Sequence, residues 1–386
     1  MRRRRLVPLL GGAALAPLVA SPARAEPPGG CAVPSARDDG WPVAAATEDK
    51  LVDRAALCRM TDGLATSPTA NVHAVLVARG GRLVFERYLS GPDEIHDRHI
   101  RNVVFDADTQ HDLKSVSKSV ASLVVGIAID RGLIDSVNQP VFSFFPELSD
   151  LRTPEKDSLK LSHVLTMSMG LAWIEATPST GNDDNDEARM HRAADPCRYV
   201  LGLPMTAPPG QEFFYNTGAL ALLSAIVRKA TGQPLDELAR TALFEPLGIT
   251  GVEWKRIKGD TDAGGGLRLR PRDMAKIGQL VLAGGRWNGR QLVPKDWIDA
   301  SITPWMKATS GFSYGYLWWL GTTRIERRDV PWIAALGRGG QSIRIVPSLD
   351  LVVAVTAGYY QDYSPQAFQL QFGIFRDVLK ATPPAG

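Results

Sequence analysis

Segments with the residue pattern of strands lie near both ends of this chain, and helical patterns fill the middle. Two apolar runs around Arg79-Gly80-Gly81-Arg82 indicate an early hairpin at 72–85. Further strands are indicated at 342–346 and 351–356, and helices at 47–64, 115–132, 219–231, 271–284 and about 364–380. This order lacks the regular alternation of a doubly wound parallel sheet. The sequence therefore predicts an α+β fold: an antiparallel sheet flanked by N- and C-terminal helices, with an all-helical lobe inserted at roughly 135–265.

The first 25 residues have the pattern of a secretory signal peptide. Four arginines at 2–5 precede an apolar stretch at 6–20, and Ala23-Arg24-Ala25 fits a small-x-small cleavage site. The apolar stretch is shorter than the roughly 20 residues that a spanning helix needs. We therefore expect cleavage after Ala25, export by the Sec or the twin-arginine route, and no stable membrane anchor afterwards. A flexible leader is expected at 26–45, and a single functional domain at 46–386.

The charge balance gives no support to nucleic-acid binding. The first 25 residues hold five arginines and no acid, so the formal net charge of +3 for the whole chain becomes −2 for the remainder. The chain also has three cysteines, which are too few for a disulfide scaffold or a zinc site. Because Cys31 lies before the first expected helix, Cys58 lies near its end, and an exported protein can be oxidised, a bridge between them is favoured. Three unpaired thiols, including Cys197, are the alternative.

Three motifs that could suggest other chemistry lack the context which that chemistry needs. Gly-Phe-Ser-Tyr-Gly at 311–315 resembles a nucleophile elbow, but an aromatic, strand-like run follows it and no histidine lies beyond Ser313. His96 and His99 have no glutamate between them and are expected to be a surface pair. The acidic run at 181–187 lacks the ligand spacing of a calcium loop, so we expect a solvated loop. No metal site is predicted.

The stronger signal is Ser115-Val116-Ser117-Lys118, at the start of the apolar helix expected at 115–132. Residues three apart lie on the same face of a helix, one turn from each other. A serine at the first turn would expose its backbone N–H at the positive end of the helix dipole, which suits an oxyanion. A lysine inside such an apolar helix is desolvated and has a lowered pKa, so it could accept the serine proton. The alternative is a serine cap followed by a surface lysine.

This stretch resembles the nucleophile helix of serine β-lactamases and penicillin-binding proteins, and other motifs follow in the family's order. They are Leu-Thr-Met-Ser-Met-Gly-Leu at 165–171, Phe-Tyr-Asn-Thr-Gly at 214–218, Gly-Gly-Gly-Leu at 264–267, Arg-Asp-Met-Ala-Lys-Ile-Gly at 272–278 and Gly-Arg-Gly-Gly-Gln at 337–341. The resemblance covers roughly 45–380, and the ordered set is more specific than any single motif.

The resemblance implies a role for each matching residue. Ser115 would be the nucleophile, Lys118 its base and Tyr215 the proton shuttle. The backbone N–H groups of Ser115 and Gln341 would form the oxyanion hole. The third motif, Arg338-Gly339-Gly340, would line the substrate, with Arg338 and Gly340 in contact with it.

Two departures separate this chain from a typical β-lactamase. The second motif places Asn216 directly after the tyrosine instead of one residue later, although Asn216 remains a candidate substrate-binding residue. In the third motif, arginine replaces the usual lysine and cannot act as a base. The sequence is therefore more similar to nylon-oligomer (aminohexanoate-dimer) hydrolases and family VIII carboxylesterases.

These features together predict a secreted serine hydrolase that forms an acyl-enzyme with an ester or an amide and needs no cofactor. Its expected partner is a small ester, amide or peptide substrate. A β-lactamase and a D-alanyl-D-alanine carboxypeptidase remain open as alternatives within the same mechanism. A non-catalytic module that binds cell-wall peptides is the alternative from another class, because a fold alone does not fix a function.

Overall fold

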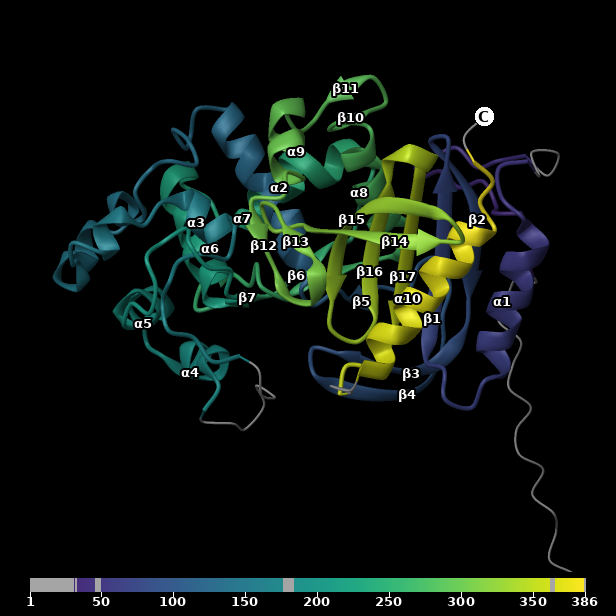
Figure 1. The fold of residues 1–386 in the computed structure, drawn as a ribbon, viewed down its shortest axis with the longest axis horizontal. Coiled ribbons are helices and arrows are strands. Elements are labelled where there is room, and N and C mark those ends of the chain that lie inside the picture. The colour runs from purple at the N-terminus through teal and green to yellow at the C-terminus, as the bar shows by residue number, and fades with distance from the viewer. Residues whose placement is uncertain (1–30, 32, 46–49, 176–183, 362–364, 385–386) are drawn as a thin grey trace, which may run out of the picture.

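A computed structural model describes residues 31, 33–45, 50–175, 184–361 and 365–384, so the predicted signal peptide lies outside the described residues. Its centre is an antiparallel sheet of eight strands (Figure 1). In spatial order these are β12 (Met306–Lys307), β13 (Ser313–Tyr314), β14 (Trp319–Ile325), β15 (Arg328–Gly337), β16 (Gln341–Val346), β17 (Leu351–Ala357), β1 (Val72–Arg79) and β2 (Arg82–Tyr88). Because β1 pairs with β17, both ends of the chain build the sheet, and the predicted fold class is confirmed.

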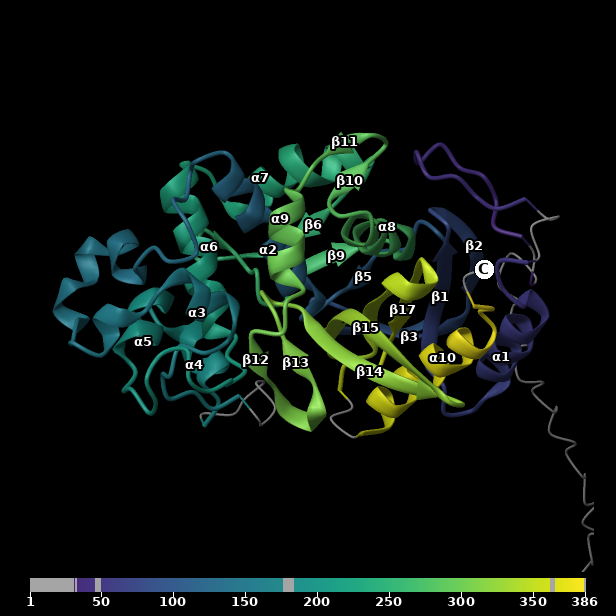
Figure 2. The same ribbon diagram turned by 45° about the horizontal axis from the view of Figure 1, so that its top comes forward.

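Helices cover both faces of this sheet. α1 (Arg54–Thr66) and α10 (Pro365–Lys380) lie on one face, while α2 (Val116–Asp130) and α8 (Pro271–Leu282) lie on the other (Figures 1 and 2). Strand β17 is buried on both sides because its side chains alternate between the two layers. Val353 and Val355 pack in the cluster that holds α1 and α10, and Val352 and Ala354 pack in the other.

The segment between 135 and 265 is mainly helical and lies beside the sheet (Figure 1). Its α-helices are α3 (Leu161–Leu165), α4 (Asp186–Arg192), α5 (Pro196–Gly202), α6 (Gly218–Thr231) and α7 (Leu235–Ala239). Shorter turns of helix are η1 (Val141–Phe144), η2 (Pro146–Leu151), η3 (Lys156–Ser158), η4 (Arg240–Phe244) and η5 (Glu245–Leu247). Gly232 closes α6 with φ of 74°, a conformation that favours glycine.

The remaining elements are short strands and helical turns. Short strands form the pairs β3 (Ser90–Ile95) with β4 (Arg98–Val104), β7 (Arg256–Ile257) with β8 (Asp260–Thr261), and β10 (Arg286–Trp287) with β11 (Arg290–Gln291). A three-stranded sheet joins β5 (His111–Asp112), β9 (Leu267–Leu269) and β6 (Glu253–Trp254). The other helical elements are α9 (Lys295–Ser301), η6 (Thr309–Gly311) and η7 (Pro347–Leu349).

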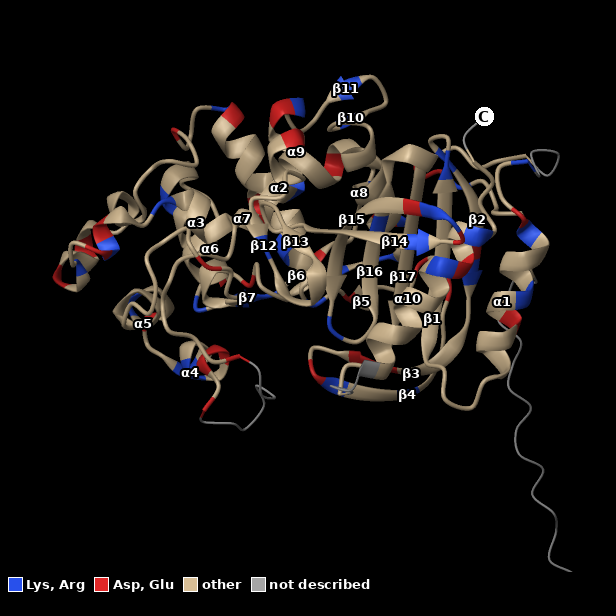
Figure 3. Ribbon diagram, viewed as in Figure 1, with Lys and Arg blue, Asp and Glu red and all other residues tan. Residues whose placement is uncertain are grey.

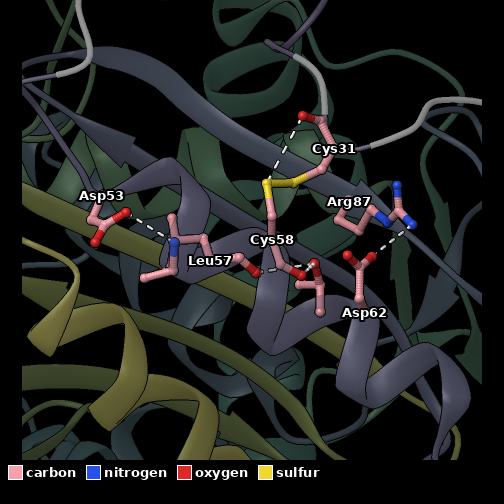
Figure 4. The surroundings of a disulfide bond; sticks show 8 residues. Cys31, Asp53, Leu57, Cys58, Asp62 and Arg87 are labelled. Atoms are coloured by element: carbon pink, nitrogen blue, oxygen red, sulfur yellow. Dashed lines mark hydrogen bonds and ion pairs between the residues drawn. A yellow bond between two sulfur atoms is a disulfide. The ribbon is translucent and has the colours of Figure 1, made fainter.

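The first helix begins later than the sequence pattern predicts. Asp53 caps α1 by accepting a hydrogen bond from the Ala56 backbone N–H at 2.9 Å, so the helix starts at 54 instead of 47. Cys31 and Cys58 are joined by a disulfide that ties the segment before this helix to the helix itself (Figure 4). Within the described residues, every helix is too short or too polar to cross a bilayer.

Candidate active site

Ser115 lies at the start of α2, held there by the strand pair β5–β9. The backbone N–H of Leu113 donates to the Leu267 carbonyl at 2.9 Å, and the Ser117 hydroxyl accepts from the Leu267 N–H at 3.2 Å. One turn into α2, the Lys118 side chain is 2% exposed. Its Nζ donates to Ser115 Oγ at 2.9 Å and to the Gly264 carbonyl at 2.7 Å. The amine is thus directed at the serine hydroxyl, as the Ser-x-x-Lys spacing predicts.

The electrostatics of this lysine come from opposing effects. Burial lowers the pKa of Lys118, and the positive charge of Arg338 lowers it further. Glu175, Glu187 and Asp262 act in the opposite direction. Because the net pKa shift is downward, the amine is closer to its neutral form than an exposed lysine and can accept a proton from the hydroxyl beside it.

Tyr215 completes this group from the segment before α6. Its phenol is close enough to Ser115 for the serine to lower the phenol pKa, and the centre of its ring lies 5.2 Å from Lys118 Nζ. Trp319 stacks against the ring with the centroids 6.1 Å apart. Burial raises the pKa of Tyr215, and the nearby Glu175 raises it as well, so the phenol stays protonated and can both donate and accept.

The segment that carries Tyr215 is fixed by Glu175, a residue that the sequence patterns did not single out. The Glu175 carboxylate accepts from the Thr217 backbone N–H at 2.7 Å, from the Thr217 hydroxyl at 2.5 Å and from Trp173 Nε1 at 2.6 Å. Asn216 is 3% exposed, and its Oδ1 accepts from the Ala219 N–H at 3.3 Å at the start of α6. Asn216 therefore caps a helix, and it is Thr217 that borders the cavity in front of Ser115.

The turn between β15 and β16 forms another wall of the cavity beside Ser115. A methyl group added at Gly337 would lie 2.3 Å from the Leu113 carbonyl and 3.3 Å from the Ser115 nitrogen, so the end of β15 packs directly against the start of α2. Gly337, Arg338, Gly339 and Gly340 all line the cavity. Gln341 is fully buried, its side-chain amide bonds to the Ala357 backbone, and it is absent from the described lining.

These groups open into a cavity of about 550 Å³. One wall is aromatic, with Phe312, Trp319 and Phe368, and another carries the acids Glu175 and Glu187. Burial, together with the neighbouring Glu175, raises the pKa of Glu187 to about 7. Basic residues are prominent around α1, β2 and the β14–β15 turn (Figure 3), and Lys114, Lys255 and Arg338 also line the cavity.

The structure also tests the weaker sequence interpretations. The expectation of a solvated loop is wrong for the described part of the acidic run, because Asn185 and Asp186 are buried at the start of α4 and Glu187 borders the cavity. Positions 181–183 lie outside the described residues. His96 borders the cavity, whereas His99 and Ser313 are not among its lining residues. The described part of the chain contains no cluster of three side chains suited to a metal.

Comparison with known proteins identifies the family. The family described as Beta-lactamase matches residues 65–364. A 6-aminohexanoate-dimer hydrolase from Paenarthrobacter ureafaciens is 28% identical over 337 residues, 80% of this chain and 78% of that protein. Esterase EstB from Burkholderia gladioli is 29% identical over 181 residues, 45% of this chain and 44% of that protein.

A solved structure gives the same fold. The octameric penicillin-binding protein homologue from Pyrococcus abyssi superposes with a TM-score of 0.62 at 18% identity, covering 86% of this chain and 79% of that one. With the family match extending over most of the sequence and the site in the same segment, this chain belongs to the β-lactamase family of hydrolases.

Proposed function

We propose that this protein is a serine hydrolase that cleaves an ester or an amide through an acyl-enzyme on Ser115. The observation that carries the proposal is the approach of the buried Lys118 amine to 2.9 Å from Ser115 Oγ, with a backbone carbonyl as its other described partner. A buried ammonium with no carboxylate partner is costly, which favours a neutral amine that can act as a base.

In the proposed reaction, Ser115 Oγ attacks the substrate carbonyl carbon while its proton passes to Lys118 Nζ. The bond to the alcohol or amine then breaks, and Tyr215 passes a proton to the leaving group and regains one from Lys118. Water next attacks the acyl-serine ester and gives up a proton to the same base. The serine hydroxyl is restored and a carboxylic acid is released.

The oxyanion would be stabilised by two backbone N–H groups, those of Ser115 and Arg338. Arg338 directly follows Gly337. A Cβ added at Gly337 would point at the Ser115 nitrogen and the Leu113 carbonyl, so this part of the chain faces the start of α2. We assign this donor to Arg338 in place of the sequence-based candidate Gln341, which is buried behind the turn. Arg338 and Gly340 remain candidates for substrate contact because both line the cavity.

An ester or a linear amide is favoured over a β-lactam. The side chain that borders the cavity after Tyr215 is Thr217, and its hydroxyl is already bonded to Glu175. The relatives named for aminohexanoate-dimer and ester hydrolysis support the same substrate class.

Fluorophosphonate labelling tests the proposed nucleophile. We expect the wild type to be labelled and Ser115→Ala to be inert. The matched control Ser313→Ala changes the serine of the other candidate motif and should be labelled like the wild type. Equal labelling of wild type and Ser115→Ala would refute the assignment.

Turnover of p-nitrophenyl esters, linear amides and nitrocefin then distinguishes an esterase, an amidase and a β-lactamase. Binding of peptidoglycan without turnover would favour the non-catalytic module.

We also propose that the protein is exported, with cleavage after Ala25. Four arginines before an apolar stretch support this, and the Cys31–Cys58 disulfide suits an oxidising compartment. Mass spectrometry of the protein secreted by its host should find residue 26 at the N-terminus. An intact residue 1 would refute it.

A further inference from the structure

A second cavity of about 340 Å³ lies behind the candidate active site. It is lined mainly by residues of α4, α5, α6 and the β7–β8 pair. His191, Thr217, Asp262 and Gly264 line both cavities. The Gly264 carbonyl accepts a hydrogen bond from the Lys118 amine beside Ser115. Because Gly264 also lines the second cavity, a single residue links that cavity to the groups around Ser115.

Four of the charged residues around the second cavity form two ion pairs within the protein. Arg228 binds Asp260 at 2.5 Å, and Lys229 binds Glu147 at 2.5 Å. Lys258 is exposed to solvent on the β7–β8 turn. Because the ion pairs already satisfy these charges, a ligand gains little from bringing a charge of its own.

Two acids and a histidine at the same cavity are also accounted for. Asp195 accepts from the Arg198 backbone N–H at 3.0 Å, and Asp262 accepts from the Gly265 N–H at 3.2 Å. Burial lowers the pKa of His191, so its ring is neutral near pH 7.

The remaining lining includes two hydroxyls, those of Thr217 and Thr261, which donate to Glu175 and Asp236, and is otherwise largely apolar. Phe145, Met190, Leu220, Ala221 and Ile257 contribute hydrocarbon surface, and Cys197 lines the cavity with an uncharged thiol. Burying an apolar chain against such surface is favourable by roughly 0.8 kcal/mol per methylene. A polar or charged chain would lose hydration without finding partners.

We propose that this second cavity binds an apolar arm of the substrate, an aliphatic or aryl chain several atoms from the scissile bond. The inference rests on the proposed function, because the arm reaches the cavity only when the substrate carbonyl is at Ser115. It names a substrate class: esters or amides with an extended, uncharged hydrocarbon chain.

The first test fills the cavity. Ala221→Leu adds a branched side chain at the lining, and Ala230→Leu makes the same change on the same helix, at a partly buried position outside the lining. Specificity (kcat/KM) is measured on p-nitrophenyl acetate against octanoate, and on methyl against octyl acetate. We expect the wild type to favour the long arm in one series by at least tenfold. Ala221→Leu should abolish that preference without changing the short substrate, and Ala230→Leu should retain it.

The result separates this inference from the proposed function. Turnover of the short esters with no long-arm preference in either series would overturn the inference alone. An equal loss on short and long substrates in Ala221→Leu would also overturn it. No turnover in the wild type, together with no fluorophosphonate labelling, would refute the proposed function and this inference with it.

A second measurement uses Cys197, the cysteine outside the disulfide, as a reporter. The rate of its modification by methyl methanethiosulfonate at pH 9 is followed by mass spectrometry, with methylboronic or octylboronic acid bound at the serine. Octylboronic acid should slow the modification at least fivefold, and methylboronic acid should leave it unchanged. Equal rates with both inhibitors would overturn the inference.

Discussion

Replacing Gly337 by alanine is a direct test of the proposed oxyanion hole. The new methyl carbon would lie 2.3 Å from the Leu113 carbonyl oxygen, about 1 Å closer than a carbon and an oxygen ordinarily approach. This nearest neighbour is backbone, so it cannot turn aside as a side chain could. The end of β15 must therefore move away from α2, and it takes the Arg338 N–H with it.

The expected loss follows from that displacement. A donor moved by about 1 Å no longer meets the oxyanion, and loss of one such donor costs about 10²–10³ in kcat, or roughly 3–4 kcal/mol. We expect kcat on p-nitrophenyl acetate to fall by at least about 100-fold, with a smaller change in KM. The thermal unfolding transition should remain cooperative.

Gly63→Ala is the matched control. Gly63 lies in α1, and an added methyl there meets no atom within 4 Å. This variant should keep full activity and gain up to about 1 kcal/mol of stability from the better helix propensity of alanine. A folded Gly337→Ala enzyme with activity within threefold of the wild type would refute the placement of the oxyanion donor at the end of β15.

Three further predictions follow from other contacts. Glu187→Gln removes a carboxylate whose negative charge, present above its own pKa of about 7, raises the pKa of Lys118. Above pH 7 the acidic limb of the pH profile of kcat/KM should therefore move to lower pH, and an unchanged or higher limb there would contradict this. Replacing both Cys31 and Cys58 by serine opens a loop of 27 residues, which should cost about 3.5 kcal/mol in urea unfolding and leave kcat unchanged. Gly126→Ala in α2 would place a methyl 2.2 Å from an indole carbon on α9. Overpacking of about 1–3 kcal/mol should outweigh the gain of about 1 kcal/mol in helix propensity, and a stabilised variant in calorimetry would show that the packing argument fails.

The elements predicted best are those whose sequence pattern matches their burial. The helix expected at 115–132 is observed at Val116–Asp130, because an apolar run ending near a glycine leaves few alternatives. The hairpin around Gly80 and Gly81 also forms where the turn residues indicate. The β3–β4 pair was not predicted, since β4 is largely exposed and its polar residues do not alternate with a buried face.

The position of the third motif shows a different limit. The resemblance makes Gln341, on the strand after Arg338-Gly339-Gly340, the candidate oxyanion donor, whereas our proposal assigns that donor to Arg338. In the structure β15 ends at Gly337 and β16 begins at Gln341, and Gly339 and Gly340 have φ of 86° and 102° in the turn between them. Glycine adopts these angles readily, but a glycine-rich motif does not reveal whether its freedom serves a strand or a turn. The sequence alone therefore left open, by a few residues, where β15 ends and which residue supplies the oxyanion donor.

The positions of the acids near Lys118 could not be predicted from motif spacing in the sequence. These acids nevertheless affect the pKa of Lys118, and so its action as the base. Glu175 contacts a residue 42 positions away, and Glu187 belongs to a run whose composition indicates a solvated loop. A base that takes a proton and later returns it works best with a pKa near the operating pH. Burial alone would hold the amine neutral in both halves of the reaction, whereas carboxylates near it restore the ability to carry the proton. The apolar helix lowers the pKa of Lys118 and the acidic wall raises it. This balance arises only in the assembled site, so it cannot be read from either segment alone.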